Sequence, residues 1–334
     1  MTENNYVNRG LPDIVRRFEG TRVLVIGDCM LDEYIYGECN RISPEAPIPV
    51  VLCNEKCDFL GGAANVSANI KAVGGEPLLV GVVGDDEPGE RLRKALGERK
   101  ISDNGLVVSH SRPTTLKTRI VAQNQQIIRL DREVFDDLSD EDLSSVKERF
   151  DGVIDSVGAV VISDYGKGVI NRAVLKHIRD VIGKEDIKTV VDPKVSHFEY
   201  YKGMTVITPN HREASDVCDI NIVDEITMTR AGKTLIDRVG CENVLITWGE
   251  RGMVLFRNGQ EDMPVFIDAT ARSVYDVTGA GDTVVAVLSL ALANGASIVD
   301  ASRIANYAGG IVVGKLGTST VLKSELIEII EKGS

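Results

Sequence analysis

The second half of the chain alternates short apolar runs with segments of helical spacing. Runs typical of buried strands fall at residues 158–163, 188–191, 204–207, 243–247 and 251–256, and helical patterns fall at 171–182, 210–218 and 225–239. Such alternation implies right-handed crossovers and a mostly parallel sheet with helices on both faces. No linker, low-complexity tract or internal repeat divides the sequence. We therefore predict a single α/β domain over residues 1–334.

Two segments nearer the amino terminus do not fit this alternation. Pro44, Pro47 and Pro49 exclude a central strand or helix around them and favour short strands outside the main sheet. Residues 115–122 and 125–130 are two further candidate strands. We expect a small lid sheet, built from about 34–55 and 110–131, that covers a ligand site, mediates a homodimer or does both, because an isolated sheet exposes a face.

Composition excludes several classes of partner. The net charge of −12 argues against nucleic acid. The apolar stretches are too short or too interrupted to span a bilayer, so we expect no membrane association. The polar start, residues 1–10, lacks the apolar core of a signal peptide, which favours the cytoplasm. The six cysteines contain no CxxC pair and give no zinc template.

The motif richest in chemistry is the run of residues 278–283, Thr-Gly-Ala-Gly-Asp-Thr. The backbone N–H groups of Gly279, Ala280 and Gly281 precede a long apolar helix and can bind an anion, because first-turn donors lack helical partners. Asp282 follows at once and can take a proton from a hydroxyl group. The pair suits phosphoryl transfer. A tight turn with a capping aspartate would explain the same residues.

Polar residues also follow five of the predicted strands. They are Gly27-Asp28, Asp164-Tyr165-Gly166-Lys167-Gly168, Asp192-Pro193-Lys194, Thr208-Pro209-Asn210 with Glu213, and Thr247 with Gly249 and Gly252. Each segment alone could be an ordinary turn. Because ligands of parallel sheets bind outside the carboxyl ends of the strands, we expect these segments to form one site.

Asp28, Asp32 and Asn65 are candidates for holding the hydroxyl groups of a polyol. The two aspartates bracket an apolar pair just past the first strand. Asn65 follows Gly61-Gly62, whose missing side chains let the backbone approach a ligand. Exposed turn residues are the competing explanation for all of them.

Asn210 and Glu213 lie three residues apart at a helix start. They fit either a capping box or a site for hydrated Mg²⁺, with Glu213 acting through water. Lys194 can neutralise a phosphate, and Thr247 with its following glycines can contact a nucleotide phosphate; solvation and a plain β-hairpin are the alternatives. Asn306 lies on a helix with small residues that could leave room for adenine.

Basic residues lie on the second lid segment. Strand alternation places Lys117 and Arg119 on one face, and Arg129 follows on the next strand. Converging cations in an acidic protein indicate a phosphorylated substrate, unless they are merely solvated charges.

These motifs resemble those of the ribokinase, or PfkB, family of sugar kinases. Residues 276–282, Asp-Val-Thr-Gly-Ala-Gly-Asp, are similar to its carboxyl-terminal signature, and residues 61–65, Gly-Gly-Ala-Ala-Asn, to its amino-terminal one. The resemblance implies a ribokinase-like fold, ATP and Mg²⁺, with a monovalent-cation requirement left open. It implies Asp282 as the base and Gly279, Ala280 and Gly281 as donors to the transferred phosphoryl group. It further assigns Asp28, Asp32 and Asn65 to sugar, Asn210 with Glu213 to Mg²⁺, Lys194 to a phosphate, and Thr247, Gly249, Gly252 and Asn306 to ADP.

A narrower resemblance rests on residues 27–32, 41–50 and 125–131. They look like the D-glycero-β-D-manno-heptose 7-phosphate kinases of lipopolysaccharide inner-core synthesis, which phosphorylate C1 and in many members are fused to a nucleotidyltransferase. Since the chain ends at Ser334, it resembles a stand-alone kinase or an isolated kinase module. A kinase for another phosphosugar, or a catalytically silent binding subunit, are the alternatives.

Overall fold

The computed structural model describes residues 10–123, 125–183, 187–259, 264–270, 275–315 and 319–333, and over these a nine-stranded sheet forms the centre of the molecule. Its order is β13-β12-β11-β10-β9-β8-β1-β4-β5. The seven strands from β11 to β5 in this order run parallel, and β12 pairs antiparallel with both β11 and β13. The strands are β1 Arg22–Gly27, β4 Glu76–Gly84, β5 Leu106–Ser109, β8 Ala159–Ser163, β9 Lys188–Asp192, β10 Val206–Ile207, β11 Asn243–Thr247, β12 Met253–Arg257 and β13 Val265–Ile267. The predicted mostly parallel sheet is confirmed.

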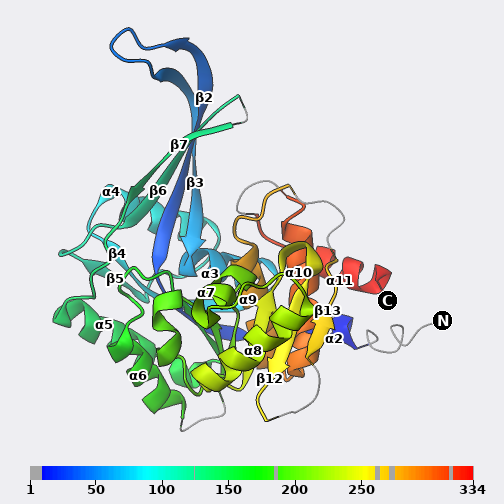
Figure 1. Cartoon of the computed structure of the whole chain (residues 1–334). Helices are drawn as coiled ribbons and strands as arrows, with labels where there is room; N and C mark the ends of the chain where they lie inside the picture. The colour runs from blue at the N-terminus through cyan, green and yellow to red at the C-terminus, as the bar shows by residue number, and fades with distance from the viewer. Residues whose placement is uncertain are drawn as a thin grey trace.

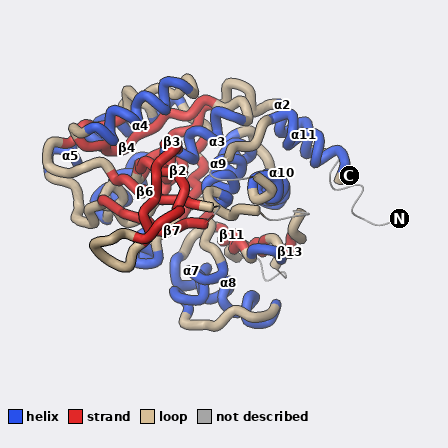
Figure 2. The backbone as a smooth tube through the Cα atoms, turned by 90° about the horizontal axis from the view of Figure 1, so that it is seen from above, coloured by secondary structure: helices blue, strands red, loops and turns tan. Residues whose placement is uncertain are grey.

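Both faces of the sheet are buried, as the apolar strand sequences require. In β1, Val23 and Val25 enter the core on one face, and Leu24 and Ile26 enter the core on the other. The first face is covered by α2 Leu11–Arg16, α3 Ala63–Ala72, α4 Glu87–Glu98, α9 Ala280–Ala293, α10 Ile298–Val312 and α11 Lys323–Lys332. The second is covered by α5 Asp140–Asp151, α6 Arg172–Ile182, α7 His211–Cys218 and α8 Glu225–Val239 (Figures 1 and 2). Within the described ranges, no helix has the length and apolarity to cross a membrane.

Most predicted elements are present within a few residues of their expected bounds. The sequence patterns did not predict β5, β13 or α5. Strands β5 and β13 are the two edges of the sheet and have only four and three residues, so their apolar patterns are too short to recognise.

A separate four-stranded sheet, the lid, projects from the body of the molecule (Figure 1). Its order is β3-β2-β6-β7, with β2 Cys29–Ile42, β3 Pro49–Gly62, β6 Thr115–Ala122 and β7 Gln125–Arg132. The expectation of short strands was wrong: β2 and β3 have 14 residues each. The prolines fall at the far tip, residues 43–48, and at the first position of β3, where a missing N–H interrupts no central ladder. Because β2 starts directly after β1 and β3 ends at α3, the base of the lid belongs to the site.

Candidate active site

The five polar strand ends lie side by side, as predicted. Strands β1, β8, β9, β10 and β11 are consecutive and parallel, so their carboxyl ends meet at one edge. A pocket of about 230 Å³ lies there, against the start of α9. Its lining residues are Asp164, Tyr165, Asp192, Pro193, Lys194, Thr208, Asn210, Glu213, Thr247, Gly279, Gly281, Asp282 and Val284. The fold thus brings together most of the residues predicted for phosphate, metal and catalysis.

The start of α9 provides backbone donors on the pocket wall. Gly279 has a left-handed φ of 78°, and the helix begins at Ala280. The Ala280 N–H lies 3.2 Å from the Val277 carbonyl, so this one donor of the predicted three is already engaged. In the described part of the chain, the N–H groups of Gly281 and Asp282 have no acceptor. A Cβ added to Gly281 would meet nothing within 4 Å, and Gly281 and Asp282 both line the pocket.

Asp282 sits in the first turn of α9 with both carboxylate oxygens held by side chains. Asn65 Nδ2 donates to Oδ2 at 2.7 Å, and the Tyr165 hydroxyl donates to Oδ1 at 2.8 Å. Burial raises the pKa of Asp282 to about 6, aided by the charge of Asp32, while the bonds from Asn65 and Tyr165 oppose the rise. The carboxylate is therefore mostly ionised at neutral pH and close enough to its pKa to exchange a proton.

The orientation of Asn65 follows from contacts between α3 and α9. The Asn69 amide donates to the Asn65 backbone carbonyl at 3.0 Å, and the Thr283 hydroxyl donates to Asn69 Oδ1 at 2.8 Å. These bonds tie the two helices together beside the base. An ionised carboxylate only accepts hydrogen bonds, so the Asn65 amide must present its NH₂ group to Asp282. Asn65 therefore positions the predicted base, whatever else it binds.

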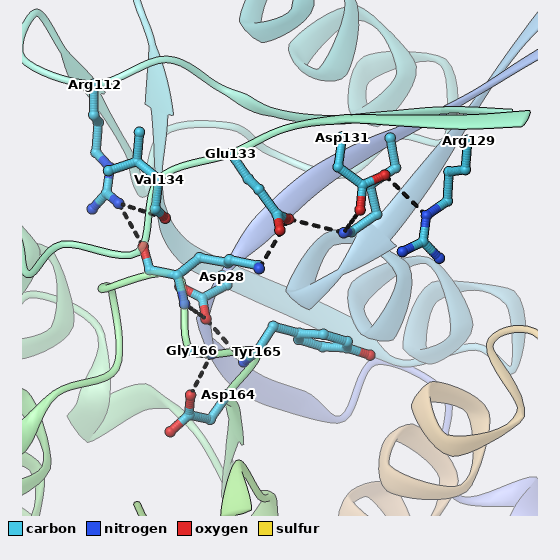
Figure 3. Close-up of polar contacts among 11 residues, drawn as sticks. Asp28, Arg112, Arg129, Asp131, Glu133, Val134, Asp164, Tyr165 and Gly166 are labelled. Carbon is cyan, nitrogen blue, oxygen red and sulfur yellow. Dashed lines mark hydrogen bonds and ion pairs between the residues drawn. The ribbon is translucent and has the colours of Figure 1, made fainter. Parts of the chain in front are cut away.

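Asp28 has a different place from the one expected of a sugar ligand. Its side chain is buried and accepts three backbone N–H groups, from Tyr165 at 2.9 Å, Lys167 at 3.0 Å and Val169 at 3.1 Å. Burial raises its pKa to about 6, and the charge of Asp164 adds to the rise. With both oxygens engaged, Asp28 holds the loop that carries Tyr165 (Figure 3).

Asp32 and the predicted lid cations share the inner face of the lid. The register pairs Asp32 with Lys117 and Tyr34 with Arg119 across β2 and β6. Arg119 forms an ion pair with Asp32. A Cβ at Gly61 would meet Asp32 Oδ2 at 2.6 Å, so glycine lets this carboxylate lie against the start of α3. Gly62 has a φ of 57°, a conformation that favours glycine.

The other lid cations are also paired with acids. Lys117 Nζ lies 3.1 Å from Asp131 Oδ2 and 2.9 Å from Glu133 Oε2. Arg129 Nε lies 3.0 Å from Asp131 Oδ1, with about half of its side chain exposed. Lys117 and Arg129 are thus joined in one network through Asp131, and Figure 3 shows Arg129, Asp131 and Glu133 of this network.

Asn210 and Glu213 form the capping box that was the structural alternative. Asn210 Oδ1 accepts from the N–H of Arg212 and of Glu213, and Glu213 Oε2 accepts from the Asn210 N–H at 2.8 Å. Glu213 nevertheless lines the pocket, as does Asp192. Burial raises the pKa of Asp192 well above its usual range, with the charges of Asp282 and Glu213 adding to the rise.

These carboxylates suit a hard divalent cation. A metal ion would relieve the mutual repulsion of Asp192 and Glu213, and Mg²⁺ prefers carboxylate and water oxygens. In the ranges that the structure covers, no three His, Cys, Asp or Glu side chains converge closely enough to hold a metal by themselves. Asp192 and Glu213 would therefore hold Mg²⁺ largely through its waters.

Gly249, Gly252 and Asn306 lie outside the pocket. Gly252 has a φ of 87°, and a Cβ there would lie 2.0 Å from the Ile267 carbonyl oxygen, so backbone packing alone requires a glycine. Asn306 donates to the Asp268 carbonyl at 2.8 Å and accepts from the Thr270 hydroxyl through its own carbonyl. Nucleotide contact by these three residues stays a prediction.

Three pocket residues were missed as individuals, although their strand ends were noted. Tyr165 binds the predicted base, and Asp192 lines the pocket together with Glu213, whose charge helps to raise the pKa of Asp192. Asp164 accepts hydrogen bonds at 2.7 Å from both the Tyr201 hydroxyl and His197 Nδ1, and this contact raises the pKa of His197. The only sequence signal was a polar residue directly after an apolar run, which does not say which partner it meets.

Backbone donors and a buried carboxylate at the edge of a parallel sheet are an arrangement suited to phosphoryl transfer. The chain belongs to the pfkB family of carbohydrate kinases, whose sequence profile matches residues 21–325. The predicted family is therefore confirmed.

Relatives of similar sequence are longer than this chain. It is 43% identical over 312 residues to the bifunctional protein HldE of Desulfatibacillum aliphaticivorans, a match covering 93% of this chain and 63% of that protein. It is 43% identical over 304 residues to the bifunctional protein HldE of Geobacter sulfurreducens, covering 91% and 62%. The chain thus spans less than two thirds of the length of these relatives.

Solved structures with the same fold are more distant in sequence. Arabidopsis thaliana ribokinase, complexed with ribose and ATP, has a TM-score of 0.73 at 19% identity, over 93% of this chain and 99% of that one. Phosphofructokinase-2 from Escherichia coli, in complex with potassium, has a TM-score of 0.75 at 17% identity, over 94% and 99%. The predicted ribokinase-like fold is confirmed.

Proposed function

We propose that this chain transfers the γ-phosphoryl group of ATP to the C1 hydroxyl of D-glycero-β-D-manno-heptose 7-phosphate. The product would be the 1,7-bisphosphate, a precursor for ADP-heptose and the lipopolysaccharide inner core, made in the cytoplasm. The observation that carries the phosphotransfer is Asp282, held by Asn65 and Tyr165 beside the free N–H groups of α9. The choice of sugar is supported by 43% identity to bifunctional HldE proteins and by the heptose-kinase motifs.

In the proposed reaction, the oxygen of the C1 hydroxyl forms a bond to the γ-phosphorus while Asp282 takes the proton of that hydroxyl. The bond from that phosphorus to the β,γ-bridging oxygen breaks, and ADP leaves. The N–H groups of Gly281 and Asp282 stabilise charge on the transferred group, with the positive end of the α9 dipole behind them. Lys194, on the pocket wall, adds a positive charge for the nucleotide phosphates. Mg²⁺ held near Asp192 and Glu213 would neutralise phosphate charge.

The test replaces the base and a matched control. Asp282→Asn keeps a side chain that can accept from Asn65 and donate to the Tyr165 oxygen, yet it cannot take a proton. ADP release with heptose 7-phosphate should fall by about 100-fold or more, while sugar binding measured by calorimetry is largely kept. Asp300→Asn alters the aspartate at the same position of α10, which does not line the pocket, and should leave the rate unchanged. A folded Asp282→Asn enzyme with near-normal turnover would disprove the assignment.

The lid also supports a homodimer. Ile42, Leu52, Ile128 and Leu130 are 63%, 67%, 47% and 54% exposed on its strands, an unusual density of apolar side chains facing solvent. We assign this sheet to contact with a second copy of the chain. Sedimentation equilibrium of the wild type and of Leu52→Asp would test it: a dimer that the substitution dissociates is expected, and a monomeric wild type at micromolar concentration would rule it out.

A further inference from the structure

We propose that Lys117 and Lys167 together bind the phosphate at the far end of the sugar, and that Glu133 occupies their site when sugar is absent. This inference rests on the proposed function, because it assigns a position to the second phosphate of that substrate. Lys117 lies on β6 of the lid, whereas Lys167 lies on the loop after β8, so the site joins two parts of the fold.

Both ammonium groups meet the same carboxylate oxygen. Lys117 Nζ and Lys167 Nζ each lie 2.9 Å from Glu133 Oε2. The side chains are only 15%, 11% and 14% exposed for Lys117, Lys167 and Glu133. Figure 3 shows Glu133 reaching from the segment after β7 toward the loop of Tyr165 and Gly166. A phosphate oxygen can replace this carboxylate oxygen, because it too can accept hydrogen bonds from two ammonium groups.

Charge decides which anion these lysines prefer. Burial opposes ionisation of Glu133, but hydrogen bonds from Lys167 and Lys117 outweigh it and lower the pKa of Glu133. The carboxylate therefore carries one negative charge. A phosphate monoester carries about −1.5 to −2 at neutral pH and has three acceptor oxygens, so it can satisfy both lysines at once.

Both lysines are connected to residues that surround the base. Lys167 is two residues after Tyr165, whose hydroxyl binds Asp282, and the Asp28 carboxylate holds the backbone N–H of both residues. Lys117 is the direct neighbour of Asp32 across β2 and β6. Lys167 is thus held near the base through the backbone of its loop, and Lys117 is held beside Asp32 by the pairing of β2 with β6.

The other lid cations are placed less well for this task. Arg129 is half exposed and forms an ion pair with Asp131. Arg119 pairs with Asp32, and its guanidinium lies 5.2 Å from the centre of the Tyr34 ring, which commits it to the inner wall of the lid. Lys167 was not among the residues predicted to bind substrate, since its loop had no visible link to the lid in the sequence.

The test uses Lys117→Met and Lys167→Met, with Lys176→Met on the exposed face of α6 as the matched control. We measure KM and kcat for heptose 7-phosphate by ADP release. We also measure the Kd of inorganic phosphate by calorimetry on protein saturated with ADP. Each site variant should raise KM and the phosphate Kd by about 10- to 100-fold, because a charge-assisted contact is lost, with a smaller change in kcat. The control should match the wild type.

Two outcomes would overturn the proposal. One is a fall in kcat at unchanged KM, which would mean that Lys167 only shapes the loop of Tyr165. The other is a phosphate Kd that neither site variant changes. A wild type that releases no ADP with heptose 7-phosphate, yet shows the expected phosphate Kd values, would refute the proposed function and leave this subsite standing.

Glu133→Gln tests the competing role of the carboxylate. It keeps the shape and removes the charge, so the phosphate Kd and the KM should both fall severalfold. Values that stay the same or rise would show that Glu133 does not compete with the substrate.

Discussion

Replacing Tyr165 by phenylalanine removes a hydrogen bond from the base, together with the contact of the same hydroxyl with Asp192. The hydroxyl donates to Asp282 Oδ1 at 2.8 Å, and this bond favours the ionised carboxylate. The half-buried ring stays in the pocket wall. We therefore expect Tyr165→Phe to raise the pKa of Asp282 and to move the acidic limb of the pH–rate profile to higher pH.

The size of the effect follows from the energy of the bond. A hydrogen bond to a charged group contributes about 1.5–3 kcal/mol, and a free-energy difference of about 1.4 kcal/mol changes a pKa by one pH unit. From a pKa of about 6 in the wild type, the variant should therefore reach about 7 to 8. The ionised fraction at pH 7 then falls from about 0.9 to between about 0.5 and 0.1, so kcat/KM should fall by about 2- to 10-fold.

The assay is ADP release at low sugar concentration across a range of pH. A substrate phosphate also titrates near pH 6, but it does so equally for both enzymes, so only the difference between the two profiles reports Asp282. Well above both pKa values the variant should recover most of the wild-type rate. Superimposable acidic limbs, or a loss that is the same at every pH, would refute this account of Tyr165.

Other substitutions test other parts of the fold. Gly281→Ala should fold with an unchanged or higher melting temperature, because its Cβ meets nothing, yet lose most activity by filling the pocket, whereas the equally uncrowded Gly97→Ala should keep its activity. Asp28→Ala leaves three backbone N–H groups without their acceptor and should lower the free energy of unfolding in urea by about 3 kcal/mol or more, together with kcat; an unchanged midpoint would contradict this. Asp164 raises the pKa of His197 above 6.5, so protonated His197 stabilises the fold at low pH, and this stabilisation is lost as pH rises through the folded pKa. The stability advantage of the wild type over His197→Gln should therefore shrink above pH 6.5. A difference that stays constant with pH would contradict the coupling.

The parts of the site that the sequence predicted are those that depend on local pattern. The α9 start was predictable because two glycines and an aspartate precede a long apolar helix. Convergence of the strand ends was predictable because consecutive parallel strands must end at one edge. Asn65 was found because the glycines before it mark a close approach, although its contact with Asp282, 217 residues away, was not.

The parts that were missed depend on where distant groups meet. In the sequence, an aspartate after a strand has the same pattern whether its carboxylate is available to a ligand or accepts backbone hydrogen bonds. For Asp28, the donors of those bonds lie 137 to 141 residues further along the chain. Tyr165 was noted only as part of a loop, since its contact with the base depends on how β8 packs against α9. The lid strands were expected to be short because the prolines dominated the local pattern, but β2 and β3 pair with each other up to Ile42 and Pro49, so the prolines shorten neither strand.

The loop of residues 164–169 links these observations, because four of its groups serve different parts of the site. Its backbone rests on Asp28, and Asp164 connects it to His197. Tyr165 extends to the base, and Lys167 extends to the lid carboxylate Glu133. A change at the lid end can therefore reach the base through only two residues of backbone. The pH profile of Glu133→Gln provides a direct measure: if the loop transmits such changes, its acidic limb will differ from the wild type, and if the loop is rigid, only KM will change.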